Sequence, residues 1–316
     1  MIRVLIAVNG FSETNIVRIR EATRGWADCV RINQEAPAAE YHQQLSEADV
    51  LIGWPEPQWL LESPLLYFQL ASVGYDSYLN LGLGEKQAFT ACNIRGVPAI
   101  PVAEQVLAMM FCLARNLHCH AIDRTEKRWQ RQLNYWEITG NTICIVGMGG
   151  IGSELARRCK AIGMNVVGVG RNPDAMPHEL LTAAFAWDEM SKAFATADHV
   201  VLCFPATAEY QNMFNKELFG CMKAGACFYN VGRGSVVDET ALADCLRSGH
   251  LRGAGLDVFQ EEPLAQDHPF WGLSNVILTP HTGGRSIHEY ERICGLFVEN
   301  LHRFHHGLPL GNVIQL

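Results

Sequence analysis

The chain has 316 residues, more than one compact core usually contains, so we expect two intimately joined domains. With 48% hydrophobic and 18% charged residues, the composition is typical of a globular protein and excludes a disordered one. The formal charge of −8 and the lack of any long run of Lys or Arg argue against a nucleic-acid partner.

Apolar runs typical of strands buried on both faces alternate with helical stretches, which predicts an α/β protein with parallel sheets. The strand-like runs are residues 3–8, 50–53, 67–72, 142–147, 165–170, 199–204, 226–231 and 276–280. Between the two groups, residues 101–123 read as one long helix that Pro101 opens at its first position and that bridges two domains.

The first residues, MIRVLIAVNG, lack the cleavage site of a signal peptide, and no later stretch approaches a membrane span. We therefore predict a cytoplasmic protein. The eleven cysteines form no C-x-x-C pair and lie mostly in apolar runs, which indicates reduced core thiols. His302 and His306 would share a helix face, but no nearby acid or cysteine completes a ligand set, so we predict no metal site.

The sharpest local pattern is TICIVGMGGIGSELARRCKAIGMNVVGVG, a strand, a G-x-G-x-x-G turn, a helix and a second strand. Gly147 permits the tight turn, Gly149 lets the backbone approach a pyrophosphate, and Gly152 lets the helix pack closely. The phosphates would then face free amides at the helix N-terminus. The predicted dinucleotide site comprises Gly147, Met148, Gly149, Gly150, Ile151 and Gly152.

The end of the second strand indicates which dinucleotide binds. A carboxylate there would bind the ribose hydroxyls of NAD and repel the extra phosphate of NADP. This chain has Gly170 followed by Arg171 and Asn172, and an arginine fork suits a phosphate dianion. We therefore expect NADPH or NADP to be preferred, with NADH or NAD possible; the alternative is an Arg171 that lies in solvent or stacks on adenine without preference.

Four segments together resemble the D-2-hydroxyacid dehydrogenase family, and most closely its NADP-preferring glyoxylate/hydroxypyruvate reductase branch. They are SVGYD (72–76), GMGGIG (147–152), NVGRGSVVDETAL (230–242), and GLDVFQEEPL (255–264) with VILTPHTGG (276–284). The resemblance implies that a small 2-keto acid, such as glyoxylate or hydroxypyruvate, is reduced to a D-2-hydroxy acid. Carried over residue by residue, the catalytic arginine, glutamate and histidine fall on Arg233, Glu262 and His281.

These three residue types suit the chemistry. Arg233 can clamp the substrate carboxylate and touch the keto oxygen, while His281 can donate the proton as hydride arrives. Glu262 is expected to hold the tautomer of His281 and raise its pKa. Taken singly, Arg233 could equally be a solvent-exposed turn residue, Glu262 part of an ordinary acidic turn and His281 a loop histidine.

The resemblance also implies contacts outside this triad. The backbone amides of Val73 and Gly74 would bind the substrate carboxylate, and Asp257 would bind the nicotinamide carboxamide, with a turn-capping carboxylate as the alternative. Further cofactor contacts are expected at Cys203, Pro205, Thr207, Val231, Arg233, His281 and Gly283, and further substrate contacts at Trp54, Arg233 and His281.

Some positions leave the substrate open. Trp54 and Tyr75 could shrink the pocket to glyoxylate and hydroxypyruvate, or line it for a larger apolar or aromatic side chain. Arg285 brings a second cation near the pocket or the cofactor. Trp129 and Trp136 lie in a segment that reaches the neighbouring active site in some relatives, although ordinary packing is the favoured interpretation.

The predicted fold is therefore α/β with two domains, each with a doubly wound, mostly parallel sheet. Residues 1–98 plus 286–316 would form a flavodoxin-like substrate domain and residues 99–285 a Rossmann cofactor domain, with the substrate in the cleft between them. The final helix, from about 286 to 306, returns to the first domain. Homodimers through the cofactor domains are usual in the family.

Two other functions stay open at this point. The same fold and triad occur in dinucleotide-sensing corepressors, which act by binding partner proteins, and the nearest enzymatic rival is an NAD-dependent phosphoglycerate dehydrogenase. Corepressors carry extra terminal segments, and several phosphoglycerate dehydrogenases carry a regulatory domain. Because this chain is expected to end just after its last helix, we expect neither addition and favour the 2-keto acid reductase.

Overall fold

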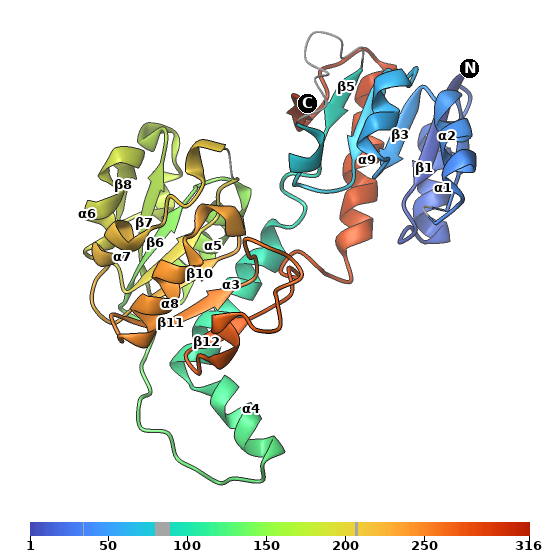
Figure 1. The fold of residues 1–316 in the computed structure, drawn as a ribbon. Coiled ribbons are helices and arrows are strands. Elements are labelled where there is room, and N and C mark those ends of the chain that lie inside the picture. The colour runs from blue at the N-terminus through green and yellow to red at the C-terminus, as the bar shows by residue number, and fades with distance from the viewer. Residues whose placement is uncertain (34, 80–88, 206–207) are drawn as a thin grey trace. The chain divides into compact units, whose positions relative to one another are not determined.

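The computed structural model describes every residue except 34, 80–88 and 206–207 (Figure 1). The chain divides into two compact units, one formed by Met1–Val97 with Ser286–Leu316 and the other by Pro98–Arg285. Each unit is built on one sheet, and both sheets are mostly parallel, so the predicted fold class is confirmed.

In the described part of the first unit, the strand order is β13-β5-β4-β3-β1-β2, and only the pairing of β13 with β5 is antiparallel. The run β2-β1-β3-β4-β5 is the flavodoxin-like order. The strands are β1 (Ile2–Ala7), β2 (Ala27–Arg31), β3 (Val50–Gly53), β4 (Tyr67–Leu70), β5 (Thr90–Cys92) and β13 (Val313–Ile314). The helices are α1 (Glu13–Ala22), α2 (Ala38–Ser46) and α9 (Glu289–His305).

The second unit has an all-parallel sheet in the order β12-β11-β10-β9-β6-β7-β8. The order reverses between β6 and β9, which is the switch point where Rossmann folds bind dinucleotides. The strands are β6 (Thr142–Val146), β7 (Asn165–Gly170), β8 (Ala183–Ala186), β9 (His199–Leu202), β10 (Ala226–Asn230), β11 (Leu251–Leu256) and β12 (Val276–Leu278). The helices are α3 (Ala99–Ala114), α4 (Leu117–Thr125), α5 (Gly150–Ala161), α6 (Met190–Phe194), α7 (Lys216–Gly220) and α8 (Glu239–Arg247).

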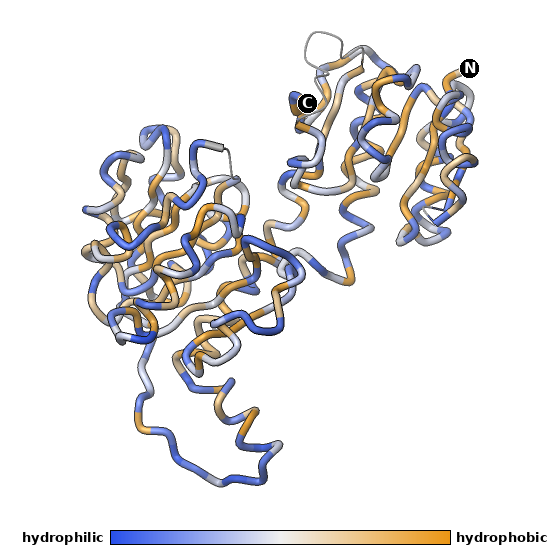
Figure 2. Tube along the Cα trace, in the orientation of Figure 1, coloured by the Kyte–Doolittle hydropathy of each residue, from blue (hydrophilic) through white to orange (hydrophobic). Residues whose placement is uncertain are grey.

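Each sheet has an apolar core on both faces, as the unbroken hydrophobic runs predict. Along β6, for example, Cys144 and Val146 belong to one buried cluster and Ile143 and Ile145 to the other. Figure 2 shows the same pattern as hydrophobic strands inside each unit. Burial on both faces leaves the strand ends and their loops to carry polar chemistry.

The structure corrects the prediction of one long helix over 101–123. Two helices, α3 and α4, are bent by 70° at a break where Asn116 adopts the left-handed conformation with φ of 51°. The first helix begins at Ala99, so Pro101 lies in the first turn but not at its first position. Among the described residues no single helix is long and apolar enough to cross a membrane; α3 and α4 pass that test only as the bent pair.

Strand β11, which the sequence pattern did not predict, carries two glycines for a packing reason. A Cβ on Gly255 would lie 2.8 Å from the Met109 sulfur and 2.9 Å from Tyr229 Cδ1. Because α3 packs this closely on the strand, glycine is required, and it removes the apolar signal of a strand from the sequence. The short strands β2, β5, β8 and β13 were missed as well.

Candidate active site

The loop after β6 has the shape of a phosphate cradle. Gly147 has a φ of 98°, and a Cβ on Gly152 would lie 2.1 Å from the Gly147 oxygen, so neither position accepts a side chain. By contrast, a Cβ on Gly149 would meet nothing within 4 Å. Gly149 is the N-cap of α5 and offers no side chain to cap it, so the open space lies where the first amides of the helix are available to an anion.

The loop after β9 closes the other side of this cradle. The Cys203 amide donates to the Val146 oxygen at 2.8 Å, and a Cβ on Gly147 would lie 3.0 Å from the Cys203 carbonyl. Burial raises the pKa of the Cys203 thiol, so the thiol stays neutral beside the predicted dinucleotide site. Pro205 is exposed in the same loop, whereas Thr207 lies outside the described residues.

Arg171 and Asn172 are exposed directly after β7, one strand away from the cradle. The pKa of the Tyr210 hydroxyl is raised, chiefly by its hydrogen bond to Glu209, and the positive charge of Arg171 opposes that rise. The charge of Arg171 is therefore felt at Tyr210, in the segment that follows β9. No carboxylate ends β7, because its last residue is Gly170.

Two glycines place Arg233 in the loop after β10. A Cβ on Gly232 would lie 2.8 Å from the Phe204 oxygen, and one on Gly234 would lie 1.8 Å from the Phe259 carbonyl carbon. The loop is thus pressed between the loops that follow β9 and β11. Arg233 Nη1 donates to the Gly232 oxygen at 2.8 Å, and the buried Val231 precedes this turn.

Glu262 and His281 come together from the loops after β11 and β12. His281 Nδ1 lies 2.8 Å from Glu262 Oε2, while Glu262 Oε1 accepts the Phe259 amide at 3.0 Å. Both carboxylate oxygens are therefore used. The His281 side chain is 52% exposed, and no described residue bonds its Nε2. Since the carboxylate accepts a hydrogen bond from Nδ1–H, Nε2 is the ring nitrogen left without a partner in the described chain.

Asp257 caps the turn that carries His281. Its Oδ1 accepts the Thr279 hydroxyl at 2.5 Å and the Thr282 amide at 3.0 Å, and its Oδ2 accepts the Gly283 amide at 2.9 Å. His281 itself has a φ of 53°, a conformation that is uncommon outside glycine and that these bonds maintain. The turn-capping alternative therefore describes Asp257, which is 3% exposed, and its contact with a nicotinamide stays a prediction.

Gly283 has a similar structural explanation. A Cβ on Gly283 would lie 2.7 Å from Asp257 Oδ2, so only glycine lets its amide approach that carboxylate. Its predicted contact with the cofactor is not required to explain the residue. Arg285 is exposed just beyond this turn and its amide donates to the Thr282 oxygen at 2.9 Å.

A second carboxylate, which sequence reasoning did not single out, anchors the Glu262 loop. Glu239 Oε1 at the start of α8 accepts the Gln260 amide at 2.9 Å, and its Oε2 lies 3.2 Å from His268 Nε2. The segment 260–268 is thus fixed at both ends by one side chain. The only signal was the position of Glu239 inside the quoted segment NVGRGSVVDETAL.

The predicted substrate-loop residues belong to the first unit. Asn93 Nδ2 donates to the Val73 oxygen at 2.9 Å, and Ser72 Oγ donates to the Gly74 oxygen at 2.8 Å. Within the described chain, neither the Val73 nor the Gly74 amide donates a hydrogen bond, so both are available to an anion. Trp54, 38% exposed, follows β3 at the same edge of that sheet.

A cavity of about 570 Å³ adjoins the Glu262 and His281 pair within the second unit. Its walls come from the loops after β11 and β12 and from the end of β12. The lining residues are Phe259, Glu262, Pro263, Leu264, Trp271, Leu278, Thr279, Pro280 and His281. This cavity places apolar surface beside the predicted acid–base pair, Glu262 and His281.

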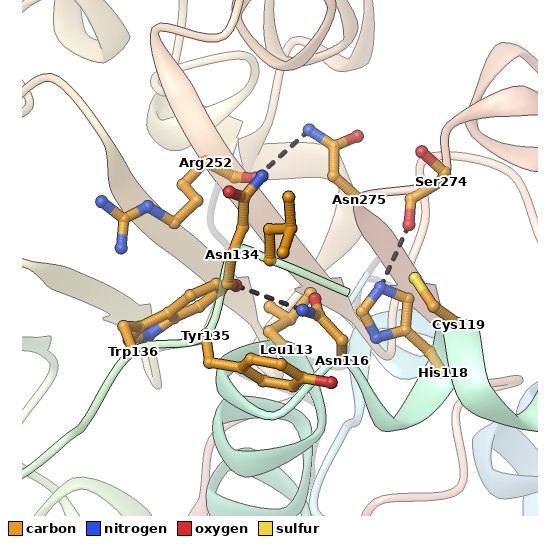
Figure 3. Close-up of a pocket in the computed structure, with 11 residues that line it drawn as sticks. Leu113, Asn116, His118, Cys119, Asn134, Tyr135, Trp136, Arg252, Ser274 and Asn275 are labelled. Carbon is orange, nitrogen blue, oxygen red and sulfur yellow. Dashed lines mark hydrogen bonds between the residues drawn. The ribbon is translucent and has the colours of Figure 1, made fainter. Parts of the chain in front are cut away.

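Another cavity, of about 480 Å³, lies near the start of β11 and β12 (Figure 3). Arg252 lies over the Trp136 ring at 4.8 Å from its centroid, His118 Nε2 bonds the Ser274 oxygen, and Asn116 donates to the Asn134 oxygen. Ligands of α/β sheets bind at the carboxyl ends of strands, so this cavity at the opposite ends is not the active-site candidate. Trp136 packs against the core of its own unit, whereas Trp129, for which ordinary packing was also the favoured interpretation, is 98% exposed.

Among the described residues, no three His, Cys, Asp or Glu side chains gather in a group that could hold a metal ion. The rings of His302 and His306 lie 4.4 Å apart at the end of α9 without a further ligand of this kind.

Comparison with known proteins gives the class. The model of the D-isomer specific 2-hydroxyacid dehydrogenase NAD-binding domain matches residues 107–283. The chain is 34% identical over 281 residues to glyoxylate/hydroxypyruvate reductase B of Salmonella schwarzengrund, which covers 83% of each chain.

Solved structures agree with this match. A D-isomer specific 2-hydroxyacid dehydrogenase family protein from Aeromonas salmonicida has a TM-score of 0.85 at 28% identity, covering 99% of both chains. A probable 2-hydroxyacid dehydrogenase from Rhizobium etli, solved with NADP, HEPES and L(+)-tartaric acid, has a TM-score of 0.80 at 26% identity and covers 100% of this chain and 98% of that one.

The fold and the glycine cradle define a dinucleotide-dependent oxidoreductase. More particularly, the chain belongs to the D-isomer specific 2-hydroxyacid dehydrogenase family, whose NAD-binding domain it contains. The family predicted from the four sequence segments is thereby confirmed.

The glycine cradle predicts that two similar substitutions change different properties, one the affinity for NADPH and the other the thermal stability. Gly149→Ala should leave the thermal midpoint unchanged, because its Cβ meets no protein atom, but should weaken NADPH binding by about tenfold or more, since the methyl group fills the space for phosphate. Gly152→Ala should lower the thermal midpoint, because its Cβ collides with the Gly147 oxygen. Calorimetry of NADPH binding and thermal denaturation distinguish the two; equal affinity in Gly149→Ala and wild type would contradict this role of the loop.

Proposed function

We propose that the protein reduces small 2-keto acids, with glyoxylate and hydroxypyruvate as the simplest, to D-2-hydroxy acids at the expense of NADPH. The observation that carries the proposal is the 2.8 Å contact between His281 Nδ1 and Glu262 Oε2, beside a loop that presents Arg233. All three side chains follow neighbouring parallel strands, β10, β11 and β12. Family membership supports the reaction class.

The cofactor would supply the hydride, and residues of the chain bind, orient and protonate the substrate. Arg233 binds the substrate carboxylate and polarises the keto oxygen, because its planar fork offers parallel donors. His281 donates a proton from Nε2 to that oxygen as the carbonyl carbon is reduced. Glu262 keeps the proton of the other nitrogen at Nδ1 and stabilises the charged ring before transfer. The resemblance also assigns the backbone amides of Val73 and Gly74 to substrate binding, and neither donates a hydrogen bond within the described chain.

The NADPH preference is proposed from Arg171. The side chain is exposed after a strand that ends in glycine, so no carboxylate repels a 2′-phosphate there. The NADP in the Rhizobium etli relative supports the same interpretation.

The reaction is tested first with His281→Ala and Glu262→Gln. His281→Ala should lower kcat for NADPH oxidation by about 10²- to 10⁴-fold, the usual loss for a general acid, without loss of NADPH binding. Glu262→Gln should give a smaller loss and a changed pH profile. His288→Ala is the matched control, because His288 Nδ1 lies 3.7 Å from Glu291 Oε2 in another His–Glu pair, outside the site. Wild-type protein that binds NADPH but reduces no 2-keto acid would indicate a binding protein of the corepressor type instead.

The cofactor preference is tested with Arg171→Ala. Loss of a hydrogen bond to a charged group costs about 1.5 to 3 kcal/mol, so kcat/KM for NADPH should fall by roughly 10- to 100-fold while that for NADH changes little. Arg247→Ala, on the exposed end of α8, is the control. If wild type uses both cofactors equally and the substitution has no effect, Arg171 does not bind the phosphate.

We also propose that two copies associate through α4 and the segment after it, which reach away from the sheet of the second unit (Figure 1). Four apolar side chains there are strongly exposed: Leu117 53%, Ile122 53%, Trp129 98% and Leu133 91%. Asp123 is 4% exposed, yet no described residue donates a hydrogen bond to its Oδ2. A second copy would cover the exposed apolar side chains and supply a hydrogen-bond donor for Asp123 Oδ2.

Ile122→Asp combined with Leu133→Asp should halve the mass measured by sedimentation velocity, because two charges would be buried without partners. Leu61→Asp, at a residue 52% exposed in the first unit, should leave the mass unchanged. A wild-type protein that sediments as a monomer would refute the association.

A further inference from the structure

Gln260, in the loop after β11, is exposed and yet makes three hydrogen bonds. Its backbone amide donates to Glu239 Oε1 at 2.9 Å, and its side-chain Nε2 donates to the Val237 oxygen at 2.5 Å and to Asn212 Oδ1 at 2.6 Å. A side-chain amide nitrogen carries two hydrogens, so both are used. Because a backbone carbonyl can only accept, the Val237 contact also fixes which end of the side chain is the nitrogen.

The Val237 contact connects Gln260 to the turn that presents Arg233. Val237 closes this turn, because its amide donates to the Gly234 oxygen at 3.0 Å. A Cβ on Gly234 would lie 2.5 Å from the Gln260 nitrogen, so the two loops also touch at the backbone. Gln260 therefore fastens its own loop to the Arg233 turn by a hydrogen bond and by close packing.

The same loop carries Glu262 two residues later. Glu262 Oε1 accepts the Phe259 amide at 3.0 Å, so Gln260 lies inside a hydrogen-bonded turn that Glu262 closes. Glu262 Oε2 lies 2.8 Å from His281 Nδ1. A shift of Gln260 would therefore move the Glu262 carboxylate relative to both His281 and Arg233. Misplacement of a reacting group by about 1 Å can lower a rate by about 10²-fold.

Asn212 holds the other hydrogen of the Gln260 amide from a constrained position. Its φ of 52° is in the left-handed region, where asparagine and glycine are found more often than other residues. Its own amide donates to the Ser235 oxygen, inside the Arg233 turn, at 2.9 Å. Glycine at position 212 would keep this backbone and remove only the oxygen that Gln260 uses.

We propose that Gln260 is a positioning residue, which holds the turn of Glu262 at a fixed place relative to the turn of Arg233. The predicted acid–base pair and the predicted carboxylate clamp can then act on one substrate molecule. The inference rests on the proposed reduction of 2-keto acids and adds Gln260 and Asn212 to its mechanism. Gln260 acts through Glu262 and not on the substrate.

Gln260→Glu is the most direct test, because it keeps the shape of the side chain and replaces both N–H donors by a carboxylate oxygen that faces the Val237 carbonyl. With glyoxylate or hydroxypyruvate, kcat should fall by about tenfold or more while KM for NADPH changes little. Added to Glu262→Gln, the substitution should lower kcat by less than about twofold further, because it acts through that carboxylate.

Two further variants separate positioning from a general disturbance of the loop. Asn212→Gly removes one of the three bonds and should lower kcat less than Gln260→Glu does. Gln266→Glu makes the same chemical change at another exposed residue of the loop and should leave kcat unchanged. Gln260 and Asn212 are both exposed, so neither substitution opens a hole in the core.

The position of Glu262 can also be measured without turnover. The NMR chemical shifts of the imidazole nitrogens report which nitrogen of the neutral His281 ring carries the proton. In wild type this should be Nδ1, because Glu262 accepts a hydrogen bond there. In Gln260→Glu the proton should divide between Nδ1 and Nε2.

The inference fails if Gln260→Glu reduces substrate as fast as wild type, or if its loss is undiminished in the Glu262→Gln background. A rise in KM for NADPH that matches the fall in kcat would show a general distortion and would also overturn it. Wild-type protein that binds NADPH but reduces no 2-keto acid would refute the proposed reduction, whereas the ring nitrogens of His281 would still decide whether Gln260 positions Glu262.

Discussion

The turn that carries His281 depends on one buried carboxylate. Asp257 follows the last residue of β11 and receives three hydrogen bonds from the turn after β12, at 2.5, 3.0 and 2.9 Å. Hydrogen bonds to a charged group are each worth about 1.5 to 3 kcal/mol, enough to hold His281 in a left-handed conformation that costs about 1 to 3 kcal/mol. The orientation of the His281 ring toward Glu262 follows from this constraint.

The other loops are positioned by close backbone contact. Gly232 and Gly234 bring the Arg233 loop against Phe204 and Phe259, while Phe259 donates its amide to Glu262. Gly147 and Gly152 do the same for the cofactor loop. At each of these places the chain approaches itself too closely for a Cβ atom, so the loops after β6, β9, β10 and β11 form one continuous packed edge of the sheet.

The two-sheet fold and the family could be predicted from the sequence, because parallel strands buried on both faces and a glycine turn leave strong local patterns. The Glu262 and His281 pair could be named from a resemblance but not placed. Turn capping by Asp257 stood only as an alternative and the role of Glu239 was not predicted, since their partners lie 21 to 29 residues away in the chain. Strand β11 was missed because its glycines serve packing, and the apolar cavity was missed because Leu264, Trp271 and Leu278 meet only in three dimensions.

Glu239 holds both the Gln260 amide and the His268 ring, while Glu262 between them holds His281. A segment tied at both ends and in its middle cannot gain or lose residues without releasing one of these bonds. Diversification of this segment during evolution is therefore expected to proceed by exchange of side chains, such as Leu264, and not by insertions or deletions. The length of the segment between Gln260 and His268 should consequently vary less among related proteins than the identity of the residues within it.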